Sequence, residues 1–184
     1  MIYLLAFLIA LVLVAFALSY NKLVSLRQLT RNAWSDVDVY LKRRAELIPN
    51  LVASVKGYAT HEQKTLEDTI AARNQALSAK SVAGRADAEQ QVSSGVSRVI
   101  AVAESYPDLK ASSNFLNLQQ GLTETEKLIA SARQYYNACV RDYNTATEAF
   151  PSSIAASLFA FKPAEFFQLE TAAEREVPRL EGLP

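Results

Sequence analysis

MIYLLAFLIALVLVAFALSY, residues 1–20, contains no charged side chain, and the first charge in the chain is Lys22. Twelve of these residues are Leu, Ile, Val or Phe. At about 1.5 Å of rise per helical residue, residues 2–20 span roughly 28 Å, close to the roughly 30 Å hydrocarbon core of a bilayer. The apolar side chains together favour insertion by roughly 5 kcal/mol. The stretch therefore predicts a transmembrane helix held in the lipid bilayer through residues 2–20.

A cleaved secretory signal is the alternative interpretation, because Ala15-Phe16-Ala17 has the small-x-small spacing of a cleavage site. No Lys or Arg precedes the apolar stretch, and the stretch is longer than the roughly 7–15 residues of a typical signal core. We therefore expect an uncleaved anchor over residues 1–21. Basic side chains such as Lys22 and Arg27 follow the span. The positive-inside rule then predicts an N-terminus outside and a cytoplasmic body.

The charge and cysteine counts exclude several classes of function. The formal net charge is zero, so no basic field indicates a nucleic-acid partner. Residues 22–56 nevertheless carry seven basic and three acidic side chains, which is compatible with anionic lipid headgroups or with a solvated helix face. Cys139 is the only cysteine, so an internal disulfide cannot form. The spacing around Cys139 is helical, and we expect a small buried side chain there.

After the anchor, apolar residues recur every three or four positions, as on one face of a helix. Neither Gly nor Pro separates the anchor from this pattern, which predicts one continuous helix. Pro49 lies within the pattern, and we expect a kink or a break there because proline removes a backbone hydrogen bond. The members of this first stripe are Leu23, Leu26, Ala33, Val37, Leu41, Ala45, Ile48, Val52 and Val55.

Three further helices follow in the prediction. Thr60 and Gln63 have the spacing of a capping box and indicate the start of the second, although continuation of the first helix through Gly57 is the alternative. The stripe of this second helix is Leu66, Ile70, Ala71 and Leu77. Residues 78–85, with Gly84, are expected to form a connection, and the third helix is expected over residues 87–105. Pro107 ends it, and the fourth is expected from residue 112 or 113 to 149. The predicted fold class is all-α, a bundle of long helices over residues 22–149.

Residues 150–184 form a different kind of segment. Five of the eight phenylalanines lie between Phe150 and Phe167, interleaved with Pro151 and Pro163. We expect this tail to fold back and cap the end of the bundle, and the alternative is an apolar patch for a partner or for the membrane surface. The final residues, from about Glu174, are expected to be mobile.

No catalytic, cofactor-binding or metal-ligating residue is predicted. His61-Glu62 resembles the start of a zinc-protease motif, but that motif needs a second histidine at position 65, where Thr65 stands, and His61 is the only histidine. A di-iron site in a helical bundle needs Glu-x-x-His motifs. A motif that ends at His61 would need a glutamate three residues earlier, where Tyr58 stands. Phosphate-binding glycine loops and nucleophile elbows are absent from the sequence.

Several charged and amide residues occur on or beside the apolar stripes: Asp36, Asp38, Arg73, Asn114, Glu126, Arg133 and Asn144. Buried charges persist only when they are paired. One hypothesis is therefore an interhelical network in which Arg73 or Arg133 pairs with Glu126 or Asp38. The alternative is that these side chains border the stripes and remain in water.

Six blocks of sequence together resemble the LemA family of bacterial membrane-anchored proteins. They are residues 20–27 (YNKLVSLR), 33–39 (AWSDVDV), 41–52 (LKRRAELIPNLV), 55–62 (VKGYATHE), 103–110 (AESYPDLK), and 143–144 (YN) leading to 150–151 (FP). The resemblance implies an antiparallel four-helix up-and-down bundle carried on one transmembrane helix at the bacterial inner membrane. It also implies no established enzymatic activity and links to envelope stress, membrane remodelling and membrane-protease partners.

The predicted function is that of a non-enzymatic scaffold or interaction protein that forms homo-oligomers at the membrane. A weak Ala6-x-x-x-Ala10 spacing would let anchor helices approach closely. A second hypothesis is an adaptor for a membrane metalloprotease in protein quality control. A third, an enzyme in its own right, would need a metal or nucleophile that the sequence does not show.

Overall fold

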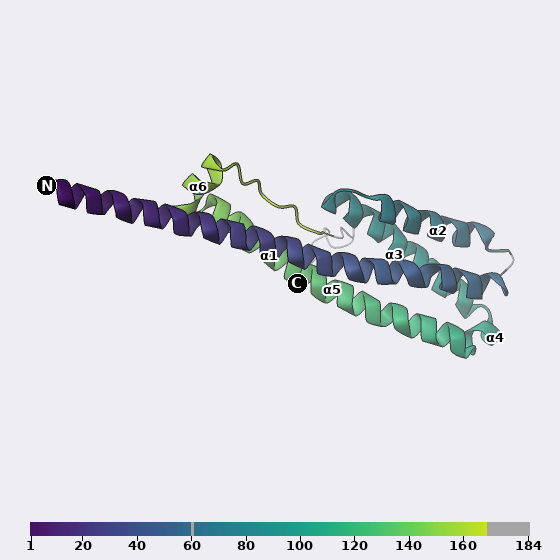
Figure 1. Ribbon diagram of the computed structural model, residues 1–184. Coiled ribbons are helices and arrows are strands. Elements are labelled where there is room, and N and C mark those ends of the chain that lie inside the picture. The colour runs from purple at the N-terminus through teal and green to yellow at the C-terminus, as the bar shows by residue number, and fades with distance from the viewer. Residues whose placement is uncertain (60, 169–184) are drawn as a thin grey trace, which may run out of the picture. The chain divides into compact units, whose positions relative to one another are not determined.

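The computed structural model describes residues 1–59 and 61–168, and all its regular structure is helical (Figure 1). No strand occurs in this described part of the chain, in agreement with the predicted all-α class. The elements are α1 (Ile2–Lys56), α2 (Gln63–Ser78), α3 (Val82–Glu104), α4 (Pro107–Lys110), α5 (Ser113–Glu148) and α6 (Ser152–Leu158).

The anchor and the first helix of the predicted bundle form one element, α1. Its N-terminal part is long and apolar enough to cross a membrane, and the side chains of that part are exposed. The predicted apolar stripe is confirmed, since its members are buried except for the half-buried Leu26.

Pro49 does not end α1, so a break there was the wrong expectation. Proline lacks the N–H that would donate to the carbonyl four residues earlier, which is that of Ala45. Arg73 of α2 donates its Nε–H to that carbonyl oxygen at 3.0 Å. The hydrogen bond that proline removes is therefore replaced by a side chain from the neighbouring helix, and α1 continues to Lys56.

The chain divides into two compact units. The first, here called the anchor unit, comprises residues 1–44 and 122–166. Within it α1 and α5 run antiparallel, because contacts that move forward on α1 move backward on α5. The Thr30 hydroxyl lies 3.3 Å from the Cys139 carbonyl oxygen, and the ring centroids of Trp34 and Tyr136 lie 5.3 Å apart.

The Phe-rich tail folds back onto the helices of the anchor unit. The hydroxyls of Tyr136 and Tyr143 donate to the carbonyls of Glu165 and Lys162, at 2.7 and 2.9 Å. The expected return of the tail is confirmed, but residues 161–165 lie along α5 rather than over its end. The part of the tail expected to be mobile, from Glu174 onward, lies outside the described residues.

The second unit, here called the hairpin unit, comprises residues 45–121 together with residues 167 and 168. Its centre is the antiparallel pair of α2 and α3. The two helices approach closely at Gly95, where an added Cβ would lie 3.0 Å from Thr69 Oγ1 and 3.3 Å from Thr69 Cα. Ser94 is next to Gly95 on α3, and Ala72 is three residues after Thr69 on α2. Both line one hollow at the surface of the two helices.

Two expectations for the hairpin unit were wrong. The connection before α3 is shorter than expected, because the Ser81 hydroxyl accepts the Gly84 N–H at 3.1 Å and caps α3 five residues earlier than predicted. α1 ends at Lys56 and α2 begins at Gln63, so the expected start of a second helix in this region is confirmed, while Thr60 of the predicted capping box lies outside the described residues. On α2 the buried residues are Leu66, Thr69 and Ala76, whereas Ala71 and Leu77 of the predicted stripe are exposed.

Candidate interaction site

The residues with potential for chemistry do not converge. Across residues 1–59 and 61–168, no group of three or more His, Cys, Asp or Glu side chains could hold a metal ion. His61 is exposed just before α2, and Cys139 is buried on α5. The arrangements on which interaction could depend are two ion pairs, an apolar groove and an aromatic cluster beside the anchor.

The ion pair of the anchor unit joins α1 to α5. Arg44 is 1% exposed, and its guanidinium lies 2.6 Å from a carboxylate oxygen of Glu126, whose side chain is 45% exposed. The hypothesis of an interhelical pair at Glu126 was therefore right, but it named the wrong arginine. Asp38 pairs within its own helix, with Lys42 at 2.7 Å.

A buried ion pair of the hairpin unit lies inside α3. Arg85 Nε lies 2.8 Å from Glu89 Oε1, and the two side chains are only 6% and 4% exposed. Sequence reasoning missed this pair, because it placed Arg85 in a connection. The spacing of four residues between opposite charges was the available signal.

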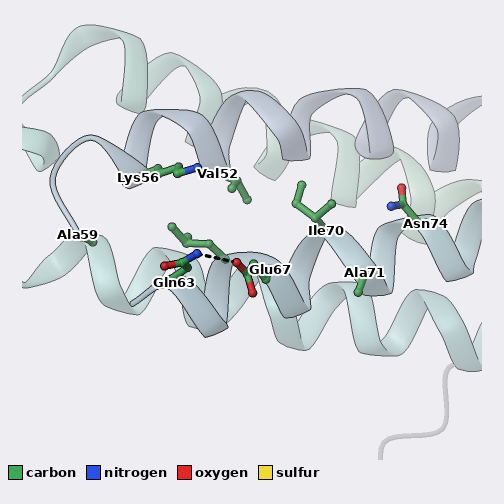
Figure 2. Close-up of a pocket in the computed structure, with 9 residues that line it drawn as sticks. Val52, Lys56, Ala59, Gln63, Glu67, Ile70, Ala71 and Asn74 are labelled. Carbon is green, nitrogen blue, oxygen red and sulfur yellow. Dashed lines mark hydrogen bonds between the residues drawn. The ribbon is translucent and has the colours of Figure 1, made fainter. Parts of the chain in front are cut away.

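An apolar groove lies between the last turns of α1 and the first half of α2, within the hairpin unit (Figure 2). Its volume is about 620 Å³. Val52, Leu66 and Ile70 supply apolar surface. A hydrogen bond of 2.8 Å joins Gln63 Nε2 to Glu67 Oε1 at one border, as the dashed line in Figure 2 shows. Such a groove can accept apolar side chains of a partner, and its lining includes no cysteine or histidine.

Within the anchor unit, an aromatic cluster forms between α1 and the segment after α6, at the point where the uncharged stretch of α1 ends. The ring of Phe159 lies 4.7 Å from that of Tyr20 and 6.0 Å from that of Phe16, measured between centroids. Phe161 lies 5.9 Å from Tyr20, and the Arg27 guanidinium lies over the Phe161 ring at 4.8 Å. The cation over the ring is attracted by its negative face. Five side chains from the two ends of the chain therefore meet at the base of the anchor.

The tyrosines that bind the tail are held in their neutral form. Burial, with a smaller effect from the charge of Glu165, raises the pKa of Tyr136 to about 12. Burial also raises the pKa of Tyr143, although the nearby charges of Arg27 and Arg31 oppose this. Both hydroxyls therefore remain hydrogen-bond donors to the tail carbonyls at neutral pH.

Comparison with models of known protein families identifies the family of this chain. A model of the LemA family matches residues 33–181. The chain belongs to the LemA family. The match begins at the first buried alanine beside Trp34, so it covers the paired helices, both ion pairs, the groove and the tail.

Three curated relatives of this LemA-family chain are magnetosome proteins. MamQ 1 and MamQ 2 of Paramagnetospirillum magneticum are each 24% identical to it, over 86% of this chain and 68% of their own length. MamQ of Magnetospirillum gryphiswaldense shows the same identity and coverage. The names of these relatives state no enzymatic activity.

Proposed function

We propose that this LemA-family protein is a non-enzymatic scaffold, anchored in the bacterial inner membrane, that self-assembles to organise the membrane or respond to envelope stress. The proposal keeps the division into an anchor (1–21), a helical domain (22–149) and a tail (150–184). The observation that supports it best is the continuity of α1. Leu23, buried against α5 and α6, follows the first charged residue directly.

The physical consequence of this continuity is a fixed orientation. A flexible linker would let the folded part rotate freely above the bilayer. Here the helix that would cross the membrane is the same helix that pairs with α5 through Thr30 and Trp34. A side chain on α5 is therefore held at a set height and angle, which favours ordered assembly of many copies.

The size of the complex tests self-assembly. The chain extracted in mild detergent should form one homo-oligomer of defined mass, measured by light scattering and by native mass spectrometry. An otherwise identical sample exchanged into a harsher detergent serves as the reference. A monomer at every protein concentration in both detergents would contradict the proposal.

Labelling with an impermeant maleimide tests the proposed cytoplasmic location of the folded part. Cys139 is buried, so the reporter should be Lys127→Cys in a Cys139→Ala background. We expect labelling only after the cells are lysed. Labelling of intact cells at position 127 would overturn the orientation.

The groove favours a second candidate function, an adaptor for a membrane metalloprotease. A glutamate at Ile70 would place a charge in its apolar lining, whereas Leu77→Glu changes an exposed residue of the same helix outside the groove. Pull-down from native membranes should then recover a stoichiometric metalloprotease with the wild type and Leu77→Glu, but not with Ile70→Glu. Recovery of no metalloprotease by the wild type would exclude the adaptor.

A further inference from the structure

The chain contains a second uncharged stretch, and its sequence position is far from the anchor. Residues 149–161 (AFPSSIAASLFAF) carry no charged side chain, between Glu148 and Lys162. This stretch contains α6, a helix of seven residues. Like residues 1–20, it is followed within two residues by a lysine and is rich in large apolar side chains.

The structure brings the two uncharged stretches together within the anchor unit (Figure 1). Ala155 and Ala156, the buried side of α6, pack with Leu23 in one cluster to which Phe16 also belongs. The ring of Phe159 touches those of Phe16 and Tyr20. α6 is therefore docked on α1 across the point where the apolar residues give way to charged ones.

The opposite side of this segment exposes large apolar side chains. Phe150 is 82% exposed, Leu158 is 70% exposed, and Ile154 and Phe159 are at least half exposed. Soluble surfaces carry single apolar residues without consequence, but a contiguous group of this kind marks a binding surface. The small side of α6 is used for packing and Phe150, Ile154 and Leu158 are left open, while Phe159 packs against Phe16 and Tyr20 and keeps half of its surface exposed.

The position of residues 149–161 along the axis of α1 indicates that their partner is lipid. Phe16 lies six residues before Lys22, or about 9 Å along the helix axis. Interfacial helices bury their apolar face about 5–10 Å into the boundary between headgroups and acyl chains. With α1 spanning the bilayer, the open side of α6 would lie at this depth. Lys22 and Lys162, both exposed, would lie on the headgroup side, where cations are attracted to anionic lipids.

We propose that residues 149–161 form a second membrane contact, in which Phe150, Ile154, Leu158 and Phe159 insert into the lipid interface beside the anchor. The occupant of this surface is lipid rather than a second protein chain, because the surface continues the exposed apolar surface of α1. The inference rests on the membrane anchoring included in the proposed function. It adds a contact that fixes the rotation of α1 about its own axis, which one spanning helix cannot do.

Site-directed spin labelling in nanodiscs tests this contact. Single cysteines would be placed at Leu158 in the segment, at Val12 in the anchor and at the exposed Arg141 on α5, each in a Cys139→Ala background. Collision with oxygen reports lipid, and collision with a water-soluble nickel chelate reports water. The ratio of the oxygen collision rate to the chelate collision rate should be high, as in lipid, at position 12 and low, as in water, at position 141. We expect the ratio at position 158 to match that at position 12.

The three positions separate the possible failures. A water-like label at 158 with a lipid-like label at 12 would overturn this inference and leave the anchor intact. Water-like labels at both positions would overturn the anchoring as well. Discs that hold a single chain exclude cover by a second copy, so protection at 158 that disappears in such discs would also overturn the lipid contact.

Discussion

Tyrosine hydroxyls join α5 to the returning tail in the anchor unit, whereas small side chains bring α2 and α3 together in the hairpin unit. Tyr136 and Tyr143 reach from α5 to the backbone of the returning tail. In the hairpin unit, α2 and α3 meet where Gly95 lies against Thr69, with almost no side chain between them. Two of the ion pairs differ too: in Arg44–Glu126 one partner is open to water, whereas in Arg85–Glu89 both partners are buried. The contact of α5 with the tail therefore depends on directional hydrogen bonds, and the contact of α2 with α3 depends on close packing.

Removal of one carboxylate from each unit should separate the two units, and removal of the buried carboxylate should give the largest effect. Glu89→Ala leaves the buried Arg85 without that carboxylate, which should lower the free energy of unfolding by about 3 kcal/mol. Glu126→Ala should cost about 1 kcal/mol, because water can reach the position of the half-exposed carboxylate. Denaturant unfolding in detergent, followed by far-UV circular dichroism, measures both.

The control for the buried pair is the double variant Arg85→Met, Glu89→Met. Replacement of both charges by apolar side chains should recover most of the stability that Glu89→Ala loses. Equal losses for Glu89→Ala and Glu126→Ala would show that burial does not distinguish the two units.

Alkaline pH should weaken the anchor unit through Tyr136. Its pKa rises from 10.0 in the unfolded reference to about 12 in the folded chain. The folded state therefore holds the proton more tightly, and the stabilisation is complete below pH 10 and is lost as the pH rises through about 12. The loss should be at most roughly 2–3 kcal/mol. Thermal unfolding across this window, compared with Tyr136→Phe, measures it.

Tyr136→Phe cannot ionise, so its stability should change less between pH 10 and 12. It also loses the hydrogen bond to Glu165, which should cost about 1 kcal/mol at neutral pH. An identical alkaline response in the variant would assign the titration to another group.

Because Arg73 replaces the hydrogen bond that Pro49 cannot make, the effects of these two residues on the stability of the hairpin unit should be coupled. The expected effect is smaller than that of the buried ion pair. Arg73→Met should cost about 1 kcal/mol, because it leaves the Ala45 carbonyl without the Arg73 donor. In a Pro49→Ala background the cost should fall, since the alanine N–H can donate to that carbonyl. A double-mutant cycle of unfolding free energies measures the coupling. Equal costs in both backgrounds would contradict the explanation.

The smallest expected effect tests how tightly α2 and α3 pack. Both Gly121 and Gly95 lie inside helices, where alanine is favoured by about 1 kcal/mol. Gly121→Ala should gain most of this, because its Cβ would lie 3.7 Å from Leu47, an ordinary contact. Gly95→Ala should gain nothing, because of the Thr69 atoms 3.0 to 3.3 Å away. Melting temperatures of the two variants provide the comparison.

A companion variant checks the cause. Thr69→Ala removes the hydroxyl and methyl groups that crowd the added Cβ, so Gly95→Ala should become favourable in that background. If Gly95→Ala stabilised the chain in both backgrounds, α2 and α3 would have room that the structure does not show.

Sequence reasoning was most accurate for the long, strongly periodic helices. The α1 stripe and the bounds of α5 agree with the structure, and so does the return of the tail. It was least accurate on α2, where an exposed Leu77 was assigned to the core and a buried Thr69 was not. Gly95 of α3 lies against Thr69, so a small residue fits this buried position of α2 better than a large one. The spacing of residues along α2 does not reveal this neighbour, because it lies on another helix.

By itself the sequence determined the uncharged apolar stretch at the N-terminus, the helical class, the long stripes and membership of the family, because these depend on the order and spacing of residues along one chain. Only the tertiary structure decided that Arg73 replaces the hydrogen bond lost at Pro49, that Arg44 is the partner of Glu126, and that α6 lies beside the anchor. The physical reason is that a hydrogen bond or ion pair is set by the register between helices. That register depends on how closely distant segments can approach, and spacing along the sequence does not record it.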